Sequence, residues 1–172
     1  MKFLIILPYF ITILFANNLK DINSFEATFK QSIINSANKE IIYTGKIYIK
    51  KPLQILWQYN EPIEKFVFIK DEYVTIIEPE LEQAIISKLD KEFNILELLS
   101  NATKISDSQY LTTFNNIQYN LTIIDNKLQQ ISYKDTIDND IFISFSNVHQ
   151  NQSIPNKTFE FQIPKEYDII RK

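Results

Sequence analysis

The chain has 172 residues and a formal net charge of −3, with no cysteine, one glycine (Gly45) and one histidine (His149). The missing cysteines exclude disulfides and lipid attachment through a thiol, and one glycine cannot build a phosphate loop or a nucleophile elbow. The usual zinc ligand sets are out of reach, and the acidic balance offers no basic patch for nucleic acid. We therefore expect no cofactor, no metal site and no nucleic-acid partner.

The start of the chain has the pattern of a secretory signal peptide. A short positive region precedes an apolar run from Phe3 to Phe15 that ends at Ala16, before a polar stretch. A membrane anchor is the alternative, but the run is shorter than the ~20 apolar residues that a spanning helix needs, and it contains Pro8. We expect residues 1–16 to be removed on export and residues 17–172 to form one domain.

The beginning of this domain predicts a short helix followed by a strand. From Asn18 to about Phe25, apolar residues recur at the spacing of one helix face. The period then changes to two, so that Phe25 and Phe29 point to the same side of a strand that runs to about Ile34. We expect the helix to lie over the apolar face of the sheet to which this strand belongs.

A β-hairpin is predicted around the stretch from Lys46 to Pro62, with its first strand beginning at Ile41, because two runs of β-branched and aromatic residues meet at Lys51 and Pro52. Apolar side chains alternate with polar ones on its second strand, and the apolar face includes Ile55, Trp57 and Tyr59. Leu56 is the one apolar residue on the opposite face. Two interpretations remain open: the apolar face is ordinary core, or Trp57 and its neighbours line a pocket that Lys51 overlooks.

Short strands at intervals of about ten residues follow the hairpin, and a helix interrupts them once. The helix is expected from Phe93 to Leu99, where Phe93, Leu96 and Leu99 share one face. Because glycine is scarce, asparagine and aspartate must supply the turns. The strands are expected at residues 65–70, 73–77, 83–88, 110–114, 117–124, 128–133 and 140–148.

These elements predict a mainly β fold with short helices, in which an antiparallel sheet or barrel has one apolar face. Two short helices can cover such a face only in part, so that either side chains fill the space or a cavity remains. Two carboxylate pairs, Asp138 with Asp140 and Glu78 with Glu80, flank turns and are typical of solvated loops. We therefore expect no enzymatic activity.

A set of ordered motifs carries a family resemblance. The motifs are Phe25-Glu-Ala-Thr-Phe-Lys-Gln31, Gly45 ahead of Lys50-Lys51-Pro52, Trp57-Gln-Tyr59, Ile77-Glu-Pro79 and Phe159-Glu-Phe-Gln-Ile-Pro164. In this order and spacing they resemble the LolA family of periplasmic lipoprotein carriers. The resemblance implies an incomplete antiparallel β-barrel, capped by short lid helices around an apolar cavity. Such a carrier takes the acyl chains of lipoproteins from an inner-membrane ABC transporter and delivers them to the outer membrane.

The resemblance also implies site residues and partners. The acyl-chain cavity and its lid would be lined by Phe25, Phe29, Ile55, Trp57, Tyr59, Phe93, Leu96 and Leu99. Lys51 stands where the family usually has an arginine that latches the lid, and a lysine offers a point charge in place of a planar fork of donors. The implied partners are outer-membrane lipoproteins, the inner-membrane Lol ABC transporter and an outer-membrane receptor of the LolB type. The protein is expected to be a periplasmic monomer.

Other functions stay open at this point. A periplasmic carrier of a different apolar ligand, such as a fatty acid or another lipid, would have the same apolar walls. A structural or sensing protein could use the same fold. The related LolB receptor is itself a lipoprotein, so that the absence of cysteine argues against that assignment.

Overall fold

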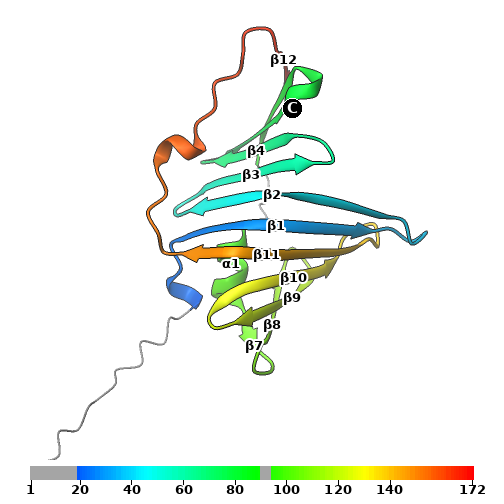
Figure 1. Ribbon diagram of the computed structural model, residues 1–172, viewed down its shortest axis with the longest axis vertical. Coiled ribbons are helices and arrows are strands. Elements are labelled where there is room, and N and C mark those ends of the chain that lie inside the picture. The colour runs from blue at the N-terminus through cyan, green and yellow to red at the C-terminus, as the bar shows by residue number, and fades with distance from the viewer. Residues whose placement is uncertain (1–18, 90–93) are drawn as a thin grey trace, which may run out of the picture.

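Twelve strands form one open sheet in the computed structural model, which describes residues 19–89 and 94–172 (Figure 1). The strands are β1 (Ser24–Ile34), β2 (Glu40–Lys50), β3 (Gln54–Glu61), β4 (Lys65–Lys70), β5 (Tyr73–Glu78), β6 (Gln83–Lys88), β7 (Thr103–Lys104), β8 (Gln109–Phe114), β9 (Ile117–Ile124), β10 (Lys127–Lys134), β11 (Asp140–Gln150) and β12 (Asp168–Arg171). Their order across the sheet is β12-β6-β5-β4-β3-β2-β1-β11-β10-β9-β8-β7. Since β12 and β7 are its two edges, the sheet is an incomplete barrel, and the expected fold class is confirmed.

The strand pairing is antiparallel throughout, except that β12 runs parallel to β6. Each strand expected from the sequence is present with its bounds shifted by two residues or fewer. The exception at β12 arises because the chain leaves β11 and passes β1 to β6 before it pairs again at the far side of β6, as the orange and red trace in Figure 1 shows.

Asparagine and aspartate supply the tight turns, as the composition predicts. Among the described residues, ten non-glycine residues have a positive φ, and nine of them are asparagine or aspartate. Asn115 and Asn116 join β8 to β9, while Asp125 and Asn126 join β9 to β10, with φ between 50° and 63° at all four positions. Positive φ at both central residues is the conformation of the two-residue turn that matches the twist of a hairpin.

The helical predictions need correction. In place of a helix from residue 18 to Phe25, the chain forms only the 3-10 turn η1 (Leu19–Asp21) before β1 begins at Ser24. The apolar spacing that suggested a helix comes instead from a short turn followed by a strand. The second prediction is confirmed as a helix, but α1 spans Ile95–Asn101. Residue 18 and Phe93 lie outside the described residues.

The start of α1 is fixed by a capping residue. The side chain of Asn94 accepts a hydrogen bond from the backbone N–H of Leu96 at 2.9 Å, which satisfies one of the donors that every helix leaves free at its first turn. No helix within the described residues is long and apolar enough to cross a membrane.

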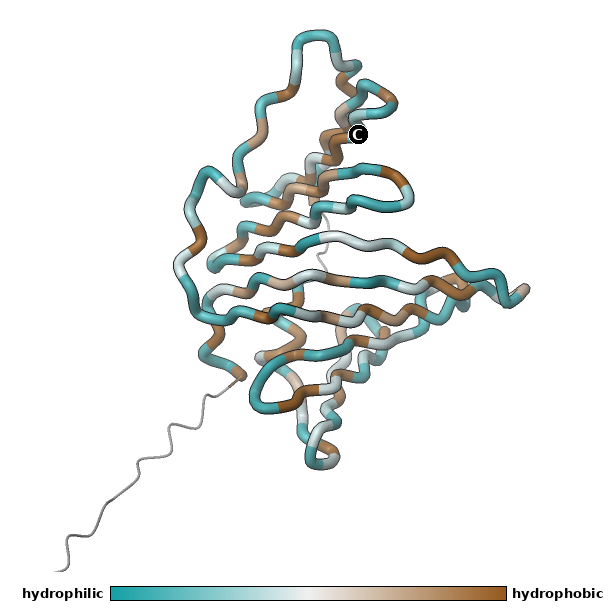
Figure 2. The backbone as a smooth tube through the Cα atoms, in the orientation of Figure 1, coloured by the Kyte–Doolittle hydropathy of each residue, from teal (hydrophilic) through white to brown (hydrophobic). Residues whose placement is uncertain are grey.

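The sheet carries an apolar core on each face. The larger core lies on the inner face, which we define as the face that α1 covers, and it includes residues of β1, β2, β3, β9, β10 and β11. The smaller core lies on the outer face of β3 to β6, where it is covered by the C-terminal segment, residues 151–167. Figure 2 shows the apolar stretches along the strands and the polar turns between them.

Two 3-10 turns complete the structure. The turn η2 (Pro79–Leu81) lies between β5 and β6, and η3 (Asn156–Phe159) lies within the C-terminal segment. Phe159 is buried at the end of η3 and belongs to the outer-face core. The C-terminal segment is therefore a packed part of the domain and not a loose tail.

Candidate functional site

The inner face carries a ladder of aromatic rings across three strands. The ring of Phe29 on β1 meets those of Trp57 and Tyr59 on β3 edge to face, with centroids 5.0 and 5.2 Å apart. Towards one end of β1, Phe25 meets Phe145 of β11 edge to face at 5.5 Å. These are the spacings that aromatic pairs prefer, so the inner face carries two groups of aromatic rings in low-energy contacts.

Gly45 allows this ladder to pack closely on the sheet. A β-carbon at this position would lie 2.8 Å from the Phe29 ring and 2.0 Å from the backbone oxygen of Gln58. Both distances are shorter than any ordinary contact, so only glycine fits here. The pairing of β2 with β3 also shifts register between Thr44 and Gly45, which brings the two backbones together at this point. The single glycine of the chain therefore seats the ring of Phe29.

Helix α1 covers the inner face from the side of η1 and β8. Its four apolar side chains, Ile95, Leu96, Leu98 and Leu99, are all buried in the inner-face core. The hydrogen bonds made by the described residues 94–102, other than the pairing of β7, stay within that stretch. Within the part of the chain that the structure describes, α1 is thus held on the sheet by apolar contacts, which are not directional.

Tyrosines line the other end of the inner face. Tyr119 and Tyr133 pack ring to ring at 4.7 Å, and Tyr43 meets Tyr59 at 5.8 Å. Burial, and next the proximity of Tyr43, raises the pKa of Tyr59 to about 12. Burial, followed by the neighbouring Tyr119 and Tyr59 hydroxyls, also raises the pKa of Tyr133. These phenols therefore stay neutral at physiological pH and give the site an apolar body with hydroxyl groups at its end.

Lys65 places a positive charge over this tyrosine end. Its ammonium lies 4.6 Å from the ring centroid of Tyr59 and 6.0 Å from that of Tyr43. Both distances are within the range of a cation–π attraction. The inner face thus changes from fully apolar under α1 to amphipathic and cationic at the tyrosine end.

The structure brings most of the predicted site residues together. Six of them are buried in one inner-face core, and they are Phe25, Phe29, Ile55, Trp57, Leu96 and Leu99. Tyr59 is partly buried and packs against the same core. Phe93 lies outside the described residues. Trp57 is only 7% exposed, so any ligand entering here must displace part of the packing on this face.

Lys51 lies beside this core and not within it. Its backbone N–H donates to the carbonyl of Asn23 at 2.9 Å, which ties the hairpin to the residues just before β1. Its side chain is exposed and lines a polar cleft together with Asn151, Gln152 and Ser153 of the C-terminal segment. Whether this ammonium latches a lid stays a prediction.

The outer-face core was not predicted, although the sequence contains a signal for it. The run Phe66-Val-Phe-Ile69 in β4 is apolar without alternation, which is typical of a strand covered on both faces. Leu56 of β3, the one apolar residue on the polar side of its strand, is part of this outer core. Among the described residues, no group of three or more His, Asp or Glu side chains could hold a metal ion.

A comparison with protein-family models decides which family the chain belongs to. Residues 20–162 match the model described as outer membrane lipoprotein carrier protein LolA. The chain belongs to the LolA family. The family is one of carriers, which confirms the expectation that the protein is a transport protein and not an enzyme.

Relatives within the family match along nearly the whole chain. The outer-membrane lipoprotein carrier protein of Campylobacter jejuni is 36% identical over 170 residues, covering 99% of both chains. That of Helicobacter pylori strain J99 is 35% identical over 156 residues, covering 90% of this chain and 83% of the relative. The corresponding protein of Wolinella succinogenes is 34% identical and covers 89% of this chain and 90% of the relative.

Solved structures support the fold alone, because their sequence identity is low. A Thermus thermophilus protein described as uncharacterized and conserved superposes with a TM-score of 0.57 at 10% identity, covering 89% of this chain and 93% of that one. A LolA superfamily protein from Nitrosomonas europaea superposes with a TM-score of 0.50 at 10% identity, covering 82% and 91%. The open sheet with a short helix is thus a LolA-like fold.

Proposed function

We propose that this protein is a periplasmic carrier that binds the acyl chains of lipoproteins on its inner face, in the place that α1 now occupies. The observation that carries the proposal is the way in which α1 is seated. A seven-residue helix packs in one core with the rings of Phe25, Phe29 and Trp57, and its hydrogen bonds to described residues stay within residues 94–102 apart from the pairing of β7. Such a cover can leave the sheet without stranding polar groups.

The burial free energies of α1 and of one acyl chain on the inner face are similar. Burying four leucine or isoleucine side chains of α1 stabilises the closed form by about 1.5–3 kcal/mol each, or about 6–12 kcal/mol together. A long acyl chain leaving water gains roughly 0.8 kcal/mol per CH₂, or about 10 kcal/mol for one chain. Because these terms nearly cancel, exchange of α1 for an acyl chain is reversible, as loading and release both require.

The proposed path of the protein has three steps. Residues 1–16 direct export and are removed, and residues 17–172 act in the periplasm. An inner-membrane ABC transporter of the Lol type supplies lipoprotein, whose acyl chains enter against Phe25, Phe29, Ile55, Trp57 and Tyr59 when Leu96 and Leu99 move away. A receptor of the LolB type at the outer membrane receives the cargo.

The decisive experiment follows lipoprotein from membrane to solution. Inner-membrane vesicles that contain a radiolabelled lipoprotein are incubated with the mature protein, with and without ATP. We expect soluble complexes that form only with ATP, together with a blue shift in the fluorescence of Trp57, the only tryptophan. If the protein binds free fatty acid with the same blue shift but never carries lipoprotein, it is a carrier of another apolar ligand.

The same assay tests Lys51. If its ammonium latches the lid, Lys51→Leu weakens the closed form and the variant accepts lipoprotein but transfers it slowly to outer membranes. Lys51→Arg restores a planar fork of donors and should transfer at least as fast as the wild type. Wild-type transfer by Lys51→Leu would show that the latch lies elsewhere.

A further inference from the structure

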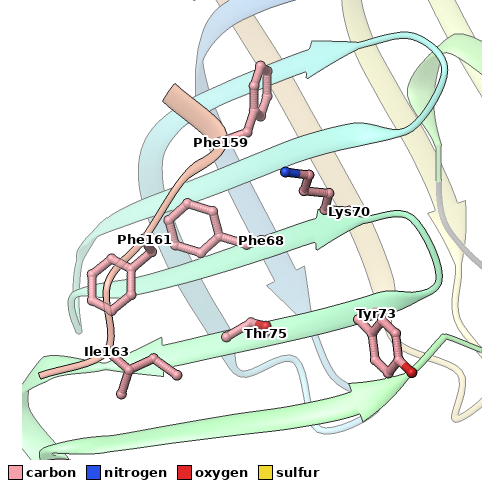
Figure 3. A pocket seen from close by; sticks show the side chains of 7 residues that line it. All are labelled: Phe68, Lys70, Tyr73, Thr75, Phe159, Phe161 and Ile163. Atoms are coloured by element: carbon pink, nitrogen blue, oxygen red, sulfur yellow. The ribbon is translucent and has the colours of Figure 1, made fainter. Parts of the chain in front are cut away.

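We propose a second binding site, on the outer face of the sheet, that takes one aromatic side chain of a protein partner together with an acidic residue beside it. The site is a pocket of about 180 Å³ between the C-terminal segment and strands β4 and β5 (Figure 3). It lies on the opposite face from α1 and is independent of the function proposed for the inner face.

The apolar half of the pocket is a rigid aromatic wall. The ring of Phe161 lies against the rings of Phe68 and Phe66, with centroids 5.6 and 6.4 Å apart. Phe159 is buried behind this wall, whereas 39% of Phe161 is exposed. Figure 3 shows Phe161 and Ile163 of the C-terminal segment beside Phe68 of β4. Rings already held in this way need no ordering when another ring joins them, which favours binding.

The polar half of the pocket offers a positive charge and two hydroxyl groups. Lys70 is exposed at the end of β4, opposite Tyr73 of β5, and Thr75 of β5 lies opposite Phe68. Glu72, in the adjoining turn, is engaged by Lys88 at 3.5 Å. Within the described residues the Lys70 ammonium makes no ion pair. A carboxylate that entered beside the aromatic wall would therefore meet a cation that no carboxylate of the described residues neutralises.

The size of the pocket points to a single side chain of a larger partner. An apolar cavity of about 150 Å³ holds benzene, so 180 Å³ has room for one ring. Sites for whole small molecules are usually about 300–1,000 Å³ and enclose most of the ligand. An open pocket of this size instead resembles the anchor sites of protein interfaces, where one aromatic residue fills a pocket and a charge fixes its orientation. We infer an aromatic residue next to an aspartate or glutamate.

The test uses three capped tetrapeptides and the isotope-labelled full domain. One peptide carries Phe-Asp at its centre, and the others carry Ala-Asp and Phe-Lys in its place. We expect the Phe-Asp peptide to shift the backbone amides of Lys70, Thr75 and Phe161, with at least a fivefold lower Kd than either control peptide. Unshifted amides at millimolar peptide, or equal binding of all three, would overturn the proposal.

Variants separate the two halves of the site. Phe161→Ala should weaken the Phe-Asp peptide at least fivefold, whereas Phe142→Ala should not, although both rings are 39% exposed. Lys70→Gln should remove the preference for Phe-Asp over Phe-Lys, and Lys127→Gln, at a distant turn, should retain it. Equal losses in the control variants would overturn the assignment of the pocket.

A small organic acid provides the last test of the pocket. If 3-phenylpropionate shifts the same amides and the Phe-Asp peptide does not, the pocket accepts free aromatic acids and the proposed protein partner is wrong. Because the inner face takes no part in this assay, failure here leaves the lipoprotein proposal intact. Conversely, a protein that carries no lipoprotein can still bind the peptide.

Discussion

The two faces of the sheet are covered in different ways. On the inner face, α1 contributes four buried apolar side chains. Apart from the pairing of β7, the strand that follows it, the hydrogen bonds of this stretch to described residues stay within residues 94–102. On the outer face, the C-terminal segment is fastened by directional bonds. Lys50 Nζ donates to the carbonyl of Ile154 at 3.1 Å and to Asn156 Oδ1 at 2.7 Å, and Ser24 Oγ donates to the carbonyl of Gln152 at 2.6 Å.

This difference separates a removable cover from a fixed one. Apolar contacts have no preferred direction, so another apolar group of similar size can replace α1 at little net cost. Displacing the C-terminal segment would break several hydrogen bonds at once, and each partner left without water or protein would cost about 1–3 kcal/mol. The segment is also held at both ends, because it continues into β11 and β12 of the same sheet. We therefore expect motion on the inner face and rigidity on the outer face.

The largest effect on stability should come from Gly45→Ala, which disturbs the packing of the inner face alone. The added methyl group would collide with the Gln58 carbonyl and the Phe29 ring, so that both strand backbone and ring must move. We expect a loss of about 3 kcal/mol or more in the free energy of unfolding in urea. Lys46→Ala, at the exposed neighbouring position, should change it by less than about 0.5 kcal/mol. Equal effects of the two would mean that the strands move apart easily here.

The next effect compares the two covers directly by hydrogen exchange. The amides of Leu98 and Ala102 in and beside α1 should open with a free energy at least about 2 kcal/mol below that of β9, because only local opening is required. The amide of Asn151, which donates to the carbonyl of Ser24 at 3.0 Å, should follow the strands instead. Protection of α1 equal to that of β9 would contradict a removable cover.

A smaller loss of stability is expected from Lys50→Met, which keeps the length of the side chain but removes both of its hydrogen bonds. We expect destabilisation by about 1–2 kcal/mol, and faster proteolysis within the C-terminal segment. Trp57 fluorescence should not change, since Trp57 lies on the other face. Lys46→Met is the matched control on the same strand. A change in Trp57 fluorescence together with faster proteolysis would show that the two covers are coupled.

The sequence predicted the inner face well because its strands obey a simple rule. In β1, β3 and β9, apolar side chains alternate with polar ones, so that the pattern itself says which residues share a face. Phe25, Phe29 and Trp57 could be grouped in this way without any knowledge of the chain path, and the structure places them in one core.

The outer face escaped prediction for the opposite reason. Its cover, residues 151–167, has no regular period, because most of it is neither helix nor strand. The helix expected from residue 18 to Phe25 was wrong because Leu19, Ile22 and Phe25 are three residues apart, a spacing that a turn followed by a strand also produces. The start of α1 depended on the cap at Asn94 and not on apolar spacing.

The last and smallest effect concerns pH and the tyrosine end of the inner face. The pKa of Tyr59 is raised from 10.0 to about 12 in the folded protein, and burial also raises the pKa of Tyr133. The folded state therefore keeps these protons at a pH where the unfolded chain has released them. The stabilisation is fully present below pH 10 and is lost as the pH rises through about 12.

At pH 11 the shift of Tyr59 should lower the free energy of unfolding by about 1 kcal/mol relative to pH 9. The measurement is urea unfolding at several pH values, together with absorbance near 295 nm, which should show that these tyrosines ionise only as the protein unfolds. A Tyr59→Phe/Tyr133→Phe double variant removes both phenols and should flatten this dependence, whereas Phe161→Ala on the outer face should leave it unchanged. An equally steep decline in the double variant would place the titrating groups outside the inner face, and the tyrosine end would then be more open to water than its packing indicates.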